Sequence, residues 1–117
     1  MEDLGYIKVS RRELIRYMRY ETHREEAAYI YSLIALAQTE LRRTVEAYGI
    51  SIELKRGQVA ISDSDLAEMW NISVRKTAQM IKNLVMSGFI DWQVIGDFNL
   101  ITVENYQSNY FYPTDNE

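Results

Sequence analysis

Two short amphipathic segments, separated by a brief break within residues 62–90, constrain the fold of this chain more than any other feature. The segment reads SDSDLAEMWNISVRKTAQMIKNLVMSGFI. Ser62 stands three residues before Asp65, a spacing typical of a helix start at which side chain and backbone cap each other. Asn71 tolerates the left-handed backbone of a tight turn, and Ser73 is a good cap for a following helix. We therefore predict two short helices joined by a tight turn.

The apolar residues of this segment fit the packing that such a pair of helices needs. Two helices that cross steeply require a small residue where they touch and an apolar residue in the turn between them. Ala67 and Ile72 meet these two needs. Leu66 on the first helix, with Ile81 and Leu84 on the second, supplies the inward face. The segment therefore predicts a helix-turn-helix.

A β-hairpin is expected directly after the second helix, which Gly88 ends. The runs FIDWQVI and NLITVEN flank Gly96-Asp97, a pair typical of hairpin turns. Apolar residues alternate in both runs and predict one inward face, formed by Ile90, Trp92 and Val94 with Ile101 and Val103.

Two more helices are expected before this segment. Ser10 with Glu13, and Thr22 with Glu25, repeat the cap spacing. The second of these helices is predicted to run on to Gly49, because apolar residues recur at helical spacing at Ala27, Ile30, Ile34, Ala37, Leu41 and Val45. The following stretch ISIELKRGQVAIS indicates extended chain, with a turn at residues 55–57.

The order helix, helix, short strand, helix, turn, helix, hairpin predicts a mostly α fold with a small β-hairpin, an α+β class. We expect a winged helix-turn-helix domain over 23–106, preceded by an N-terminal strand and short helix over 1–22. Residues 107–117 hold the only proline and lack periodicity, so we expect a flexible C-terminal arm. One core is expected to hold Ile30, Ile34, Leu66, Ala67, Ile72, Ile81, Leu84 and Ile90.

The exposed face of the second helix of the pair is the candidate functional surface. With the inward stripe fixed, the residues left on or beside the outer face are Ser73, Val74, Arg75, Lys76, Ala78, Gln79, Lys82 and Asn83. Arg and Gln read base edges in the major groove, and Lys suits phosphates. Ser62 and Ser64, at the start of the first helix, complete the predicted contacts. Duplex DNA is thus the expected partner, although these charges also suit an ordinary solvated helix.

The run LKRGQVAISDSDLAEMWNISVRKTAQMIKNLVMSGFI, followed by LITVENY, resembles the winged-helix domain of phage and mobile-element replication proteins. The opening GYIKVSRREL and the later YSLIALA are also similar to that family's amino-terminal strand and first helices. The resemblance implies DNA binding by the helix around Arg75 to Lys82, with the hairpin as the wing. The chain departs from the family pattern at Thr77, Val74 and Ala78, and its hairpin around Gly96-Asp97 carries no Lys or Arg.

Charge leaves a second function open. The formal net charge is −4, and the chain from Asp97 onward holds four acidic and no basic residues. DNA affinity must then come from local placement of charge. Val74, Ala78 and the bare hairpin instead favour a winged helix converted to a protein-interaction module in a replication or regulatory assembly.

No motif indicates an enzyme, a cofactor or a metal site. The chain has no cysteine, and its single histidine, His23, has no second ligand nearby in sequence. No apolar run approaches the roughly 20 residues of a membrane span, so we expect a cytoplasmic, non-enzymatic protein with no membrane partner. The segment IRYMRY and the Tyr-rich tail offer further aromatic surface, and for this reason we expect a homodimer.

Overall fold

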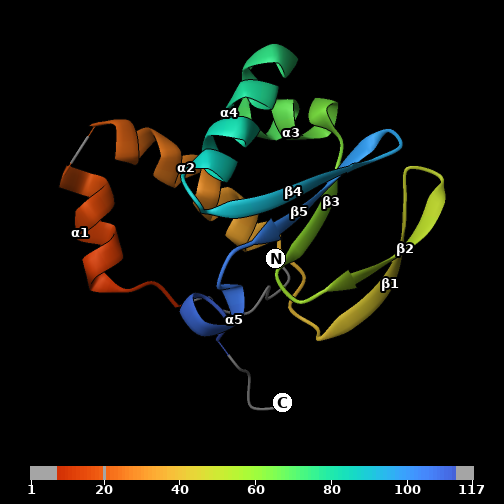
Figure 1. Ribbon diagram of the computed structural model, residues 1–117, viewed down its shortest axis with the longest axis horizontal. Helices are drawn as coiled ribbons and strands as arrows, with labels where there is room; N and C mark the ends of the chain where they lie inside the picture. Colours follow the sequence, from red (N-terminus) through yellow and green to blue (C-terminus); the bar gives the residue numbers. More distant parts are fainter. Residues whose placement is uncertain (1–7, 20, 113–117) are drawn as a thin grey trace, which may run out of the picture.

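The computed structural model describes residues 8–19 and 21–112, which form an α+β fold with two small antiparallel sheets (Figure 1). In chain order the described elements are α1 (Arg11–Arg19), α2 (Glu21–Leu36), β1 (Arg42–Ala47), β2 (Ile50–Lys55), β3 (Gln58–Ile61), α3 (Asp63–Trp70), α4 (Val74–Met86), β4 (Ile90–Ile95), β5 (Phe98–Val103) and α5 (Tyr106–Asn109).

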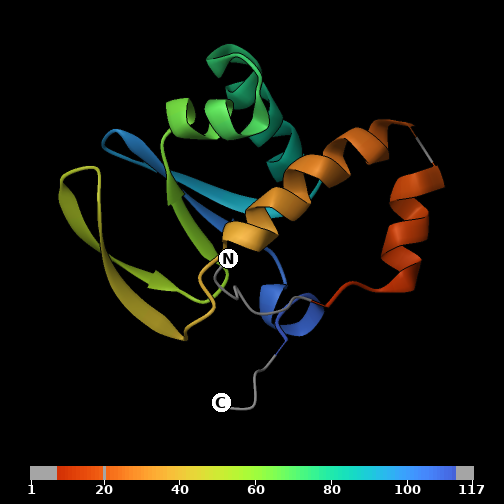
Figure 2. The same cartoon turned by 180° about the vertical axis from the view of Figure 1, so that it is seen from behind.

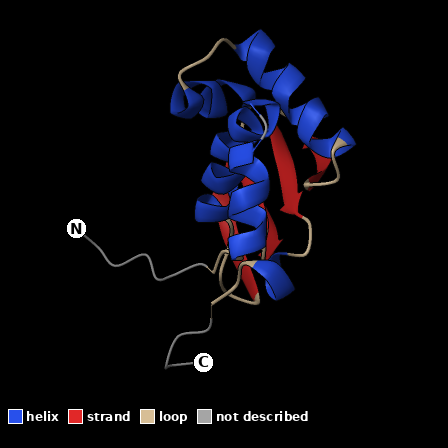
Figure 3. Ribbon diagram, turned by 90° about the vertical axis from the view of Figure 1, so that its left-hand side faces the viewer, coloured by secondary structure: helices blue, strands red, loops and turns tan. Residues whose placement is uncertain are grey.

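The larger sheet has the strand order β3-β5-β4, with β5 in the centre. Ile101 of β5 lies opposite Val59 on one side and Trp92 on the other. The views from behind and from the side show α3 and α4 crossing at one end of the molecule, from which the strands run toward the other end (Figure 2 and Figure 3). The hairpin predicted around Gly96-Asp97 is confirmed as β4–β5, but Val94, which was expected on its inward face, is 60% exposed.

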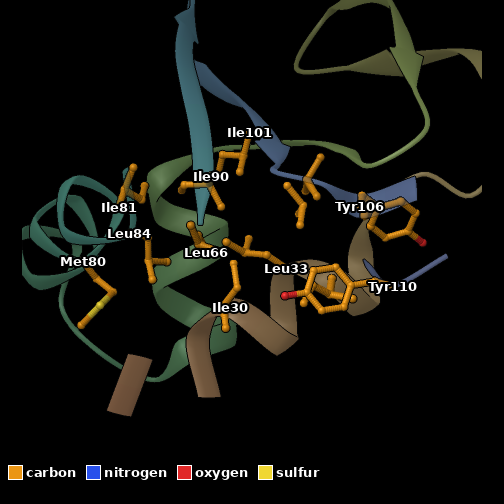
Figure 4. Close-up of a cluster of buried hydrophobic side chains, with 14 of the residues drawn as sticks. Ile30, Leu33, Leu66, Met80, Ile81, Leu84, Ile90, Ile101, Tyr106 and Tyr110 are labelled. Carbon is orange, nitrogen blue, oxygen red and sulfur yellow. The ribbon is translucent and has the colours of Figure 1, made fainter. Parts of the chain in front are cut away.

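The core lies between α2, α3, α4 and the three-stranded sheet (Figure 4). The predicted core residues Ile30, Ile34, Leu66, Ile81, Leu84 and Ile90 are confirmed in one buried cluster. Ala67 is also buried. Ile72 is only half-buried and lies outside that cluster, because the turn that carries it sits at the edge of the packed layer.

The predicted extent of the second helix is wrong at both ends. The helix α2 begins at Glu21, so Thr22 lies within its first turn, and it ends at Leu36 rather than near Gly49. The chain leaves the helix because Gln38 joins the β2–β3 turn: its N–H donates to the Gln58 carbonyl at 2.9 Å, and its carbonyl accepts from the Gly57 N–H at 2.8 Å. These long-range bonds replace the next turn of helix.

A two-stranded ribbon, β1–β2, stands where this helix was expected to continue. Tyr48 and Gly49 form its two-residue turn with φ of 53° and 84°. Positive φ at both central residues is the geometry of the type I′ hairpin turn. The Tyr48 hydroxyl accepts from the Ser62 N–H at 2.8 Å and donates to Asp65 at 2.5 Å, and the ring stacks on Phe98 at 5.2 Å. The ribbon tip is therefore fixed to the start of α3.

The C-terminal residues 107–112 pack on the domain, in contrast to the flexible arm expected from the sequence. Tyr110 and Phe111 are buried, and the Arg56 guanidinium lies 3.8 Å from the Phe111 ring centroid. The Tyr110 hydroxyl donates to the carboxylate of Glu13, which also faces Tyr31. Burial, with the negative charge of Glu13, raises the pKa of Tyr31 to about 12. Residues 113–117 lie outside the described part of the chain.

The beginning of the chain is described from Lys8 onward, so the N-terminal strand predicted within 1–22 lies mostly outside the described residues, and residues 8–10 form no strand. The predicted cap at Ser10 is confirmed, since its hydroxyl accepts from the Glu13 N–H at 3.0 Å. The Lys8 N–H donates to the Tyr110 carbonyl at 2.9 Å. Both ends of the described chain therefore meet.

We expect Gly57→Ala to destabilise the protein by about 1–3 kcal/mol. Gly57 has φ of +89°, and an added Cβ would lie 2.8 Å from the Tyr106 Cβ. Gly49→Ala is the matched control, because Gly49 has a similar φ of +84° but nothing within 4 Å of an added Cβ. Urea unfolding of both variants separates the steric term from the backbone term. Equal losses in the two variants would contradict close packing of Tyr106 on the β2–β3 turn.

Candidate nucleic-acid interface

The capping residues of α3 and α4 set the geometry of the predicted helix-turn-helix segment. The Ser62 hydroxyl accepts from the Asp65 N–H at 3.1 Å, and the Ser73 hydroxyl accepts from the Lys76 N–H at 3.0 Å. Asn71 closes α3 with φ of 56° and ψ of 45°, the left-handed conformation. The Ile72 N–H then donates back to the Ala67 carbonyl at 3.1 Å. The chain reverses direction between the helices within three residues.

One face of α4 is buried against the core, and this face determines which residues point outward. Its buried side chains are Thr77, Met80, Ile81 and Leu84. Thr77 is fully buried, and its hydroxyl is still hydrogen-bonded, because it donates to the Ser73 carbonyl at 2.9 Å. This bond explains how a polar residue occupies a position in the inward stripe.

The outer face of α4 carries most of the predicted contact residues. The exposed ones are Ser73, Val74, Arg75, Lys76, Gln79, Lys82 and Asn83, whereas Ala78 is half-buried. Arg75, Gln79 and Lys82 follow one another at spacings of four and three residues, so they share one face of the helix. Val74, with 48% of its surface exposed, adds an apolar residue at the start of this face. The structure thus brings a basic and amide-bearing strip to the surface.

Ser62 and Ser64 lie at the start of α3, apart from this strip. Ser64 is exposed. The N–H and the hydroxyl oxygen of Ser62 already have partners within the protein, since the N–H donates to the Tyr48 hydroxyl and the hydroxyl oxygen accepts from the Asp65 N–H. Both serines line a cavity of about 220 Å³ that extends to the β4–β5 turn at Gly96 and Asp97.

A buried amide joins the β4–β5 hairpin to α3. The side-chain nitrogen of Asn99 donates to the Ile61 carbonyl at 3.0 Å and to Asp63 at 2.7 Å, and its oxygen accepts from the Trp92 indole at 2.8 Å. Asn99 is only 4% exposed, so these three bonds satisfy it completely away from solvent. The hairpin is thereby held in a fixed position beside the helix pair.

Sequence reasoning missed the β1–β2 ribbon and with it the role of Tyr48. The ribbon tip covers the amide of Ser62, one of the helix-start groups that otherwise suits a phosphate. The signal was present in the sequence: Tyr48-Gly49 separates two six-residue runs, RRTVEA and ISIELK. Tyrosine is an uncommon first residue of this turn, which favours Asn, Asp or Gly.

The residues that the structure describes contain no group of three or more His, Cys, Asp or Glu side chains placed to hold a metal ion. The side chain of His23 lies outside that description. No described helix combines the length and the apolar character needed to cross a bilayer. Comparison of the chain with protein-family models, curated proteins and solved structures gives no match.

Proposed function

We propose that this chain is a non-enzymatic winged helix-turn-helix protein that binds duplex DNA through the outer face of α4. The observation that carries the proposal is the pairing of a tightly turned α3–α4 unit with an exposed strip of Arg75, Gln79 and Lys82. The succession of α2, β3, α3, α4, β4 and β5, with the β1–β2 ribbon inserted between α2 and β3, supports it, because a winged helix places its second helix and its hairpin in this order.

The chemistry of the strip fits the major groove. Arg75 and Gln79 lie one helical turn apart, and their forked donors and acceptors suit guanine and adenine edges. Lys76 and Lys82 suit backbone phosphates, which position the protein without reading sequence. The resemblance of the chain to phage and mobile-element replication proteins supports a role in replication or transcriptional control of such an element.

The alternative function is a winged helix that binds a protein partner. Three exposed apolar side chains favour it: Val74 at 48%, Val94 at 60% and Met86 at 86%. The β4–β5 hairpin also presents Asp91 and Asp97 rather than basic residues. Neither feature suits a wing that clamps a phosphate backbone.

We expect Arg75→Ala and Gln79→Ala each to weaken binding to a preferred duplex by about 1–3 kcal/mol and to relax its sequence preference. Lys82→Ala is the matched control for a phosphate contact. It should weaken binding to all duplexes alike and lower the slope of log K against log salt by about 0.9. Fluorescence anisotropy with random and selected duplexes over a salt series measures both effects.

The two functions predict opposite results in this experiment. Two results together would overturn DNA binding through α4. The affinity would not depend on salt for any of the duplexes, and Arg75→Ala would not change it. The interaction module would then be supported if the chain captures a protein partner and if Val74→Asp or Met86→Asp abolishes this capture.

A further inference from the structure

The outward face of the β1–β2 ribbon changes charge along its length. Alternation along the two strands turns Val45, Ile52 and Leu54 toward the body of the protein, where they are half-buried or buried. The residues that alternate with these point to the outward face and are exposed. They are Arg42, Thr44 and Glu46 on β1 and Ser51, Glu53 and Lys55 on β2. The two cations lie where the ribbon begins and ends, and Glu46 lies toward the tip.

Strand register places the two cations directly opposite each other. Arg42 pairs with Lys55 across the ribbon, and Arg43 is the next residue along β1 and is also exposed. Opposed residues have Cβ atoms about 4.5–5.5 Å apart, and like charges at this spacing cost free energy. Glu53 on the same face is a diagonal neighbour of Arg42, and Glu46 lies farther toward the tip, so the positive charge is confined to the Arg42–Lys55 end of this face.

Nearby polar groups do not neutralise this patch. Arg56, the next cation, turns away: its side chain donates to the Thr39 carbonyl at 2.7 Å and to Gln107 at 2.9 Å. Among the side chains that the structure describes, no carboxylate forms an ion pair with Arg42 or Lys55. Arg43 pairs with Leu54 and so belongs to the other face of the ribbon, which leaves Arg42 and Lys55 as two opposed exposed cations that can attract an anion.

We propose that Arg42 and Lys55, which we call the ribbon root, form a second contact site for the phosphodiester backbone of DNA. Two opposed cations whose Cβ atoms lie about 5 Å apart can contact one phosphate together or two successive phosphates. Figures 1 and 2 show the open end of the β1–β2 ribbon at the same end of the molecule as α5, away from α3 and α4. The inference rests on the proposed DNA binding and adds a contact that α4 does not supply.

The experiment uses fluorescence anisotropy to measure how a random-sequence duplex binds to four forms of the protein. It compares their slopes of log K against log salt. Arg42→Ala/Lys55→Ala should lower the slope by about 0.9 if the two cations contact one phosphate and by about 1.8 if they contact two, because each lost phosphate contact lowers it by about 0.9. Arg11→Ala/Arg12→Ala is the matched control, since it removes the same two charges from exposed positions on α1 and should leave the slope near that of the wild type. The fourth form, Lys76→Ala/Lys82→Ala, lowers the slope through α4.

Each outcome decides between the two proposals. A slope that falls with the ribbon-root variant and not with the α1 variant supports the second site, whatever the α4 variant does. Equal slopes for the ribbon-root and α1 variants, with a loss for the α4 variant, overturn the second site and leave DNA binding through α4 intact. A wild-type protein that binds no duplex overturns both proposals. Circular dichroism spectra of all four forms exclude misfolding as the cause of a lost slope.

Discussion

Leu66→Ala is expected to remove about 2–5 kcal/mol from the free energy of unfolding. Leu66 is fully buried in the cluster that joins α2, α3, α4 and the sheet (Figure 4). Its truncation loses the transfer free energy of the removed carbons and leaves a cavity that α2 and α4 can close only in part. Because domains of this size have about 5–15 kcal/mol of stability in total, the loss is large.

The control for this prediction is Met86→Ala, on the exposed side of α4. Met86 is 86% exposed, so its truncation should change stability by no more than about 0.5 kcal/mol. Urea unfolding followed by circular dichroism gives both values, with unchanged denaturant slopes showing that the unfolding transition itself is preserved. Similar midpoints for Leu66→Ala and Met86→Ala would mean that α3 does not pack as described.

The segment from Ser62 to Val103 was largely predictable because its signals are local. The caps at Ser62 and Ser73, the left-handed turn residue Asn71 and the helical spacing of Ile81 and Leu84 each act within a few residues. Their geometry in the structure follows directly from these side chains. The exposed strip on α4 was predictable for the same reason, since it is the complement of the inward stripe.

The ribbon was missed because its decisive contacts are distant in sequence. Leu41 and Val45 continue the helical period of α2, and this period outweighed the strand preference of the intervening Thr44. What ends the helix is the pairing of Gln38 with the β2–β3 turn, together with the Tyr48 bonds to α3. Neither can be recognised until the positions of both partners are known.

The surfaces that the C-terminal aromatics cover could not be identified from the sequence for a related reason. Tyr106, Tyr110 and Phe111 have no regular period. Tyr106 packs on Gly57, Phe111 lies under Arg56, and Tyr110 contacts Tyr31 and Glu13. Their burial also removes most of the Tyr-rich tail as a basis for the expected homodimer. Tyr112 remains 51% exposed.

Asn99→Asp is expected to destabilise the protein by about 3–5 kcal/mol at neutral pH, although it changes only one atom. The amide nitrogen now donates to Ile61 and to Asp63, the latter at 2.7 Å. The substitution removes both donors and places a second carboxylate at that distance from Asp63, in a site that is only 4% exposed. Two facing carboxylates away from solvent repel each other and lack the hydrogen bonds that would compensate them.

The pH dependence distinguishes this charge repulsion from a loss of packing. Sharing one site makes it harder for the variant's two carboxyl groups to ionise together, so the folded state holds a proton that the unfolded state releases above about pH 4. Folded protein then binds more protons than unfolded protein, and the variant loses stability as pH rises. The deficit relative to the wild type should therefore shrink as the pH is lowered toward about 4.

Two further variants complete the test of the Asn99 network. Asn99→Leu also removes the three hydrogen bonds but adds no charge, so its deficit should be independent of pH between about 4 and 7. Asn105→Asp adds the same charge at an exposed position that makes no side-chain cap bond, and should change stability by no more than about 0.5 kcal/mol. A deficit for Asn99→Asp that stays constant with pH would show that Asp63 does not face residue 99. In that case the β4–β5 hairpin would lack its buried link to α3, and its position beside the proposed DNA-binding helix would rest on the pairing of β5 with β3, on core packing and on the stacking of Tyr48 on Phe98.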